Sequence, residues 1–131
     1  MDPEAMVEAI VAAANTPEPE VAVAAVLEVI LNHFQDALPI VHGMMPTTPF
    51  RPQRARMIGT MFQALLDATS KLMVHYVELG AIQGKPDELA QVLVGLAQSS
   101  AWQQFFDRGR GVSVAGMVSL FFNGCRTQPQ R

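Results

Sequence analysis

Apolar residues recur every three or four positions along most of the chain, which is the spacing of amphipathic helices. The pattern breaks at residues 15–17, 46–52, 80–86 and 109–113, where proline, glycine and small polar residues collect. No interval between these breaks alternates apolar and polar residues as a half-buried strand does. The chain is therefore predicted to be all-α, with five to six helices.

Several prolines mark predicted helix boundaries. Pro3, Pro17 and Pro86 fall at helix starts, where the fixed backbone angle of proline suits the first turn. Pro39 instead falls inside the second predicted helix, where proline removes a backbone donor and clashes with the preceding turn. We expect residues 40–45 to leave at a new angle or to form a separate short helix.

The two last predicted helices, over residues 86–109 and 113–125, are apolar on more than one face. A helix of this kind must be buried nearly all round. In a domain this small, the terminal pair achieves such burial only against a second copy or a missing segment.

Composition supports a single domain over residues 1–131 with an unusually apolar surface. Half of the 131 residues are hydrophobic and only 16% are charged, and the mean hydropathy is +0.20. A typical soluble domain has about a quarter charged residues. Self-association is the simplest way to cover the surplus apolar surface.

Charge is unevenly spread. Residues 1–50 hold seven acids and no Lys or Arg, and the one basic cluster (Arg51, Arg54, Arg56) sits beside a proline-rich loop. We therefore expect no direct nucleic-acid contact by this chain. The single cysteine, Cys125, excludes an intrachain disulfide and indicates a cytoplasmic protein. The longest apolar run, 21–31, is too short for a membrane span, so we expect no membrane partner.

The sequence offers no frame for catalysis. The three histidines, His33, His42 and His75, lie at no metal-ligand spacing, and phosphate loops and nucleophile elbows are missing. His33 and Asp36 are interpreted as a helix-surface pair. We expect no enzyme activity, no metal and no cofactor.

Eight methionines favour a plastic apolar pocket, because methionine fills irregular cavities. The kink at Pro39 and the stiff loop after it should keep the second and third helices apart, and an apolar small molecule would occupy the gap. The alternative is that these residues form an ordinary core. The predicted lining is Phe34, Leu38, His42, Met44, Met61, Phe62, Leu65, Tyr76 and Trp102, with His33 as a further polar contact.

Three segments carry a family resemblance: 76–82, 86–96 and 114–126. The first ends a helix in a glycine turn, the second approximates D-P-E-x-A-x-x-L-x-G, and the third ends in an L-F-L-x-G-like stretch. They resemble the C-terminal half of TetR-family transcriptional regulators, and segment 27–39 is similar to the part that lines the effector pocket there. The matching positions are Asp87, Glu88, Ala90, Leu93 and Gly95, and then Leu120, Phe121, Phe122 and Gly124.

The resemblance implies an orthogonal or up-down bundle that senses an effector and forms a homodimer through its last two helices. The family's DNA-reading head has no counterpart here, so the chain is either a domain of a longer regulator or a protein that lost the head. The alternative function is a helical protein–protein interaction module without a small-molecule ligand. The expected dimer interface comprises Leu89, Val92, Gly95, Leu96, Met117, Leu120 and Phe121.

Overall fold

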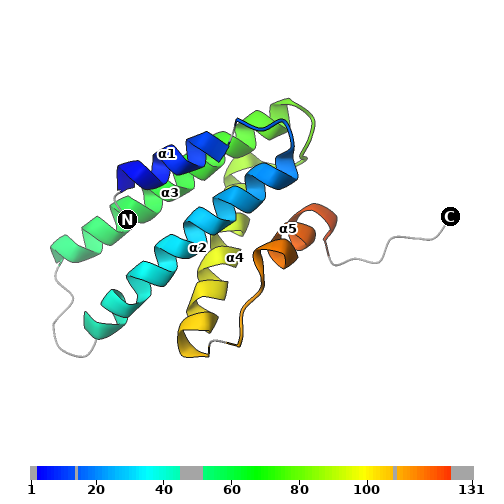
Figure 1. The fold of residues 1–131 in the computed structure, drawn as a ribbon. Helices are drawn as coiled ribbons and strands as arrows, with labels where there is room; N and C mark the ends of the chain where they lie inside the picture. Colours follow the sequence, from blue (N-terminus) through cyan, green and yellow to red (C-terminus); the bar gives the residue numbers. More distant parts are fainter. Residues whose placement is uncertain (1–2, 14, 45–51, 108, 125–131) are drawn as a thin grey trace.

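The computed structural model describes residues 3–13, 15–44, 52–107 and 109–124 (Figure 1). These residues form five helices: α1 (Pro3–Ala13), α2 (Pro19–Met44), α3 (Pro52–Glu78), α4 (Pro86–Phe106) and α5 (Val114–Asn123). The described part contains no strand. The all-α prediction is therefore confirmed.

Local signals in the sequence set most helix ends. Four of the five helices begin at a proline, as the sequence predicts for α1 and α4. Helix α5 begins after Ser113, whose hydroxyl accepts a hydrogen bond from the Gly116 amide at 3.0 Å. Gly80 follows α3 with a φ of 74°, a left-handed conformation that glycine adopts without strain.

Pro39 lies inside one continuous helix, because α2 runs through it to Met44. The alternative of a separate short helix over residues 40–45 is wrong. Proline removes a single hydrogen bond and faces solvent here, whereas its neighbour Leu38 is buried. Burial of the apolar face outweighs the local cost of the proline, which is about 3 kcal/mol in a helix interior.

The first four helices surround a common core in the ring order α1, α2, α4, α3. Helices α2 and α3 each contact both α1 and α4, while they contact each other only sparsely. Helix α5 packs mainly on α2, at the side away from α1 (Figure 1). The predicted separation of α2 and α3 is therefore present, with α1 and α4 filling the space on either side.

The hydrophobic core is built by large apolar side chains from all five helices. Methionine contributes to it at three positions, which fits the gap-filling role of this side chain. The fully or almost fully buried members with large side chains are Met6, Ile10, Val23, Val26, Leu27, Ile30, Leu65, Leu72, Met73, Tyr76, Leu93, Val94 and Met117.

Helix α2 is the most apolar long element. Its span Pro19–Pro39 is long and apolar enough to cross a membrane by length and composition alone, with a mean hydropathy of 1.4. The central helix of a bundle has the same composition, and Val23, Leu27 and Ile30 of this span are fully covered by the other helices.

Candidate functional site

Helix α4 carries apolar residues on two opposite sides. Its inner side, which faces α2 and α3, buries Ala90, Leu93, Val94, Ala97, Ser100 and Ala101. Small residues at four of these positions let α4 approach both neighbouring helices closely. The inner side therefore accounts for the fold and leaves the opposite side of the helix for other contacts.

The outer side of α4 presents a stripe of exposed residues spaced by three and four positions. We call Val92, Gly95, Ser99, Trp102 and Phe106 the α4 stripe. The exposed fractions of its large members are 51% for Val92, 38% for Trp102 and 60% for Phe106. A 3-4 spacing on one helix side is the pattern that packs against another helix at a shallow crossing angle.

Aromatic rings gather at the C-terminal end of the α4 stripe. The Trp102 and Phe106 ring centroids lie 5.1 Å apart in a T-shaped arrangement, and the Phe105 centroid lies 5.2 Å from that of Phe106. Edge-to-face contacts of this kind fix ring orientation. The result is an ordered aromatic surface, of the kind that anchors protein interfaces.

Gly95, in the middle of the α4 stripe, has no structural explanation within the described chain. A Cβ atom added there would meet nothing within 4 Å, and the residue has ordinary helical geometry. Glycine costs a helix interior about 1 kcal/mol relative to alanine. A partner that packs closely against the α4 stripe would explain the glycine at this position.

The residues predicted for the dimer interface divide into three groups. Val92, Gly95 and Leu120 are exposed, and Leu120 places 43% of its surface in solvent. Leu89, Leu96 and Phe121 are half-buried against the core. Met117 is fully buried within the chain and is a core residue. Phe106, which sequence reasoning placed on the fourth helix without a role, is the most exposed aromatic of the described residues.

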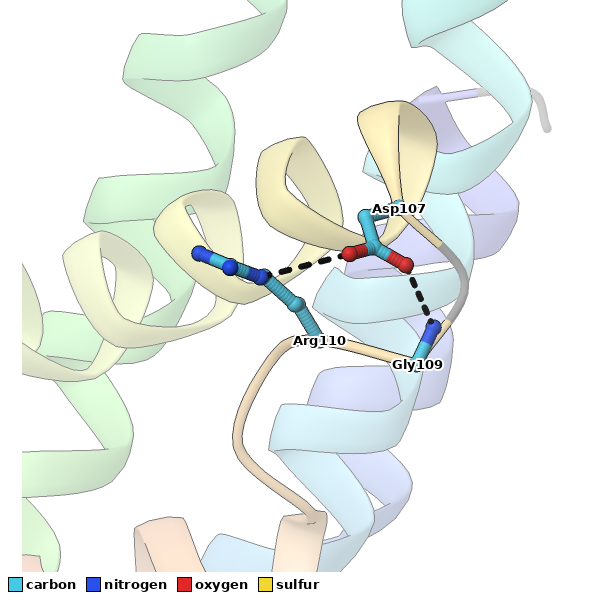
Figure 2. Close-up of polar contacts among 3 residues, drawn as sticks. All are labelled: Asp107, Gly109 and Arg110. Carbon is cyan, nitrogen blue, oxygen red and sulfur yellow. Dashed lines mark hydrogen bonds and ion pairs between the residues drawn. The ribbon is translucent and has the colours of Figure 1, made fainter.

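The loop between α4 and α5 is held by side chains at the end of α4. Asp107 accepts the Gly109 amide at 3.2 Å and pairs with Arg110, whose Nε lies 3.2 Å from the other carboxylate oxygen (Figure 2). This exposed pair contributes little stability. Ser100 also holds the loop. Its buried hydroxyl accepts a hydrogen bond from the Val112 amide and donates one to the Val112 carbonyl, each at 2.9 Å.

Some of the residues predicted to line an effector pocket come together between α2 and α3. The Phe34 and Phe62 ring centroids lie 6.4 Å apart, and both side chains are half-buried against the core. Leu38 and Leu65 are buried one turn further along their helices, and Met61 is half-buried. The side chains of His42 and Met44 lie outside the described part of the structure.

Tyr76 and Trp102 are separated from this group. Tyr76 is fully buried near the opposite end of α3, and its hydroxyl donates to the Thr16 carbonyl at 2.7 Å. This bond ties α3 to the connection between α1 and α2, so the hydroxyl is already used by the fold, and burial raises the pKa of Tyr76. Trp102 was expected to line the pocket. It belongs instead to the exposed α4 stripe.

His33 is not the helix-surface residue that the sequence suggests. Its side chain is only 8% exposed, and its ring meets that of Phe34 edge-on at 5.5 Å. Burial lowers the pKa of His33, and the nearby Asp36 opposes this effect. Burial therefore favours the neutral form of His33, next to the Phe34–Phe62 pair.

Hollows also occur elsewhere on the described surface. One of about 280 Å³ lies between α1 and α3, where Val7, Val11 and Leu72 form apolar walls. Another, of about 480 Å³, lies between α2 and α5 and is lined by residues that include Glu28, Val118 and Phe122. None of the predicted effector residues lines either hollow. Among the described residues, no group of three or more His, Cys, Asp or Glu side chains could hold a metal ion.

Comparison with known proteins identifies no relative, since no protein-family model, no curated protein and no solved structure matches this chain. The resemblance to TetR-family regulators stays a prediction from the sequence. The α4 stripe and the Phe34–Phe62 region are the two candidate sites of this chain.

Proposed function

We propose that the chain is the effector-sensing and homodimerisation domain of a TetR-like transcriptional regulator, and that two copies pair through α4 and α5. The observation that carries the proposal is the α4 stripe. Its spacing, its aromatic end and its central glycine all suit a helix that packs against another helix. A second copy supplies such a helix with the same stripe.

The proposed effector is an apolar small molecule that enters beside Phe34 and Phe62. These two half-buried rings, with Met61 next to them, lie where the sparse contact between α2 and α3 leaves the helices free to adjust. Neutral His33 next to Phe34 offers a polar group without an unpaired charge. Binding there would favour one packing of α2 against α4, and the dimer would pass this change to DNA-reading heads elsewhere.

The dimer is tested with a matched pair of exposed valines. Val92 lies on the α4 stripe, whereas Val11 is 61% exposed on α1, which contacts α2 and α3 only. We expect Val92→Glu to weaken the dimer by at least roughly tenfold, because the carboxylate loses its water in the interface. Val11→Glu should leave association unchanged.

The measurement is sedimentation or light scattering of the purified chain from micromolar concentration upward. A monomeric mass at all concentrations contradicts the proposed pairing. Equal weakening by Val92→Glu and Val11→Glu would show that the α4 stripe has no special role in association.

Effector binding is tested by thermal unfolding with a panel of apolar aromatic and fatty compounds. A compound that binds only the folded chain must raise the melting temperature, by an amount that grows with its concentration. Phe62→Ala should abolish the increase, whereas Val11→Ala should keep it. No increase with any compound, in a chain that dimerises normally, contradicts the sensing function alone.

A second candidate function is a helical protein–protein interaction module without a small-molecule ligand. The observation that favours it is the filled core, in which Leu65 and Tyr76 are fully buried and the Tyr76 hydroxyl is hydrogen-bonded. Such a module would use the α4 stripe to dock a different protein. The thermal panel separates the two functions.

A further inference from the structure

A chain of side-chain hydrogen bonds runs from α2 across α4 to the loop before α5. Gln35 on α2 donates from Nε2 to Oε1 of Gln104 on α4 at 2.5 Å. Gln104 donates from its own Nε2 to the Ser100 hydroxyl at 3.5 Å. Ser100 then makes its two bonds to the Val112 backbone. Three side chains thereby join residues that are far apart in sequence: Gln35 lies 69 residues before Gln104, and Ser100 lies 12 residues before Val112.

The groups in this chain fit one another in a single arrangement. One orientation of the Gln104 amide satisfies both of its neighbours, with its oxygen towards Gln35 and its nitrogen towards Ser100. The Ser100 hydroxyl donates once and accepts from two partners, which is its full capacity. A change at one member therefore alters the bonding available to the next.

Gly111 shows that the loop backbone rests directly on these side chains. A Cβ atom there would lie 2.8 Å from the Ser100 Oγ and 2.9 Å from Gln104 Cγ. The residue also has a φ of 102°, which glycine adopts without strain. The loop backbone therefore packs closely on Ser100 and Gln104, and displacement of these side chains towards Gly111 would move the loop.

We propose that Gln35, Gln104 and Ser100 form a relay that couples the position of α2 to that of the α4–α5 loop and so regulates pairing of two copies. The inference rests on the proposed pairing through α4 and α5. Its input is α2, which carries Phe34 next to Gln35, and its output is Val112 and the start of α5. An effector that shifts α2 would thereby loosen or tighten the dimer face.

The test combines amide hydrogen exchange with a double-mutant cycle on the full chain. We expect Ser100→Ala to raise exchange of the Val112 amide by roughly tenfold or more, because the buried acceptor is lost. Gln35→Ala should raise the same exchange by roughly threefold, through Gln104. Because Gln35 lies at the surface, the Gln35→Ala variant should fold even if the Ser100→Ala variant does not.

Gln63→Ala is the control. It removes an exposed amide–carboxylate hydrogen bond of 2.9 Å to Asp67 within α3, which has no part in the relay. Exchange at Val112 should not change in this variant. Unchanged exchange at Val112 in Gln35→Ala overturns the relay.

The dimer dissociation constant gives the second measurement. Gln35→Ala and Ser100→Ala should each raise it by a few fold, and the double variant should be no weaker than Ser100→Ala alone, because both interrupt one chain of bonds. If the fold-increase in the dissociation constant of the double variant equals the product of the two single increases, the coupling is overturned. If the chain never dimerises while Val112 exchange still responds to Gln35→Ala, the proposed pairing and its regulation are contradicted, and only the coupling of α2 to the α4–α5 loop is supported.

Discussion

The two sides of α4 have similar hydrophobic content and opposite environments. On the inner side, Val94 is 1% exposed in the ring of helices, whereas Val92, two residues earlier, is 51% exposed on the α4 stripe. The inner side combines small residues with Leu93 and Val94 and packs on α2 and α3. The outer side collects Trp102 and Phe106 at one end, with Gly95 and Ser99 between them and Val92. One side therefore builds the fold, and the other is suited to an external partner.

This difference indicates that burial on α4 follows from its neighbours and not from its own hydrophobicity. A buried valine on the inner side stabilises the chain itself. An exposed valine on the outer side stabilises only a complex, because its apolar surface leaves water when a partner packs on it. Substitutions on the two sides of α4 should therefore affect chain stability and association separately.

The largest expected effect distinguishes the two valines directly. Val94→Asp places an isolated carboxylate in the core, at a cost of several kcal/mol against a total stability of about 5–15 kcal/mol. We expect this variant to be largely unfolded by circular dichroism. At concentrations where the chain is monomeric, Val92→Asp should retain the helical spectrum and the denaturation midpoint of the unchanged chain. Loss of helical signal in both variants would refute the distinction between the sides.

The next effect concerns the loop that rests on the inner side. Gly111→Ala combines a strained positive φ with a contact of 2.8 Å to the Ser100 Oγ. We expect a loss of about 1–3 kcal/mol in the free energy of unfolding, measured by urea denaturation. Gly109→Ala provides the comparison, because a Cβ there would meet only an Asp107 oxygen at 3.7 Å.

Gly95→Ala should separate chain stability from association. The new methyl group meets nothing within the described chain, and alanine is the better helix former. We expect the free energy of unfolding of the monomer to rise by up to about 1 kcal/mol. The dimer should weaken, because the methyl group blocks close approach at the middle of the α4 stripe. Denaturation at low concentration and sedimentation at high concentration measure the two effects, and unchanged association would remove Gly95 from the interface.

The smallest expected effect is a pH dependence from His33, next to the Phe34–Phe62 pair. Burial lowers the pKa of this imidazole in the folded chain, so the unfolded chain binds more protons at mildly acidic pH. Stability should be full above the usual histidine value of about 6.5 and should fall as the pH drops below it. His33→Gln should flatten this part of the denaturation profile. His75→Gln, on the exposed side of α3, should leave it in place.

Much of the fold could be predicted from local signals. The proline-marked starts of α1 and α4, the Ser113 cap and the Gly80 turn all act within one turn of chain, so the sequence contains the whole cause. One of the two alternatives expected after Pro39, a separate short helix, is wrong, because burial of the helix face that includes Leu38 outweighs the local cost of the proline. The hydrogen bonds of Ser100 and Gln104 gave no sequence signal, since their partners are distant along the chain.

The sequence by itself determined that the chain is helical, where most helices begin, and that α4 and α5 carry more apolar surface than one face can bury. Only the tertiary structure decided which residues that surplus exposes. In the structure, Tyr76 lies in the core, Trp102 lies on the α4 stripe, and Met117 is buried within the chain and not in the predicted interface. The physical reason is that a helix that is apolar nearly all round has no preferred face of its own, so its orientation is set by the helices that pack against it.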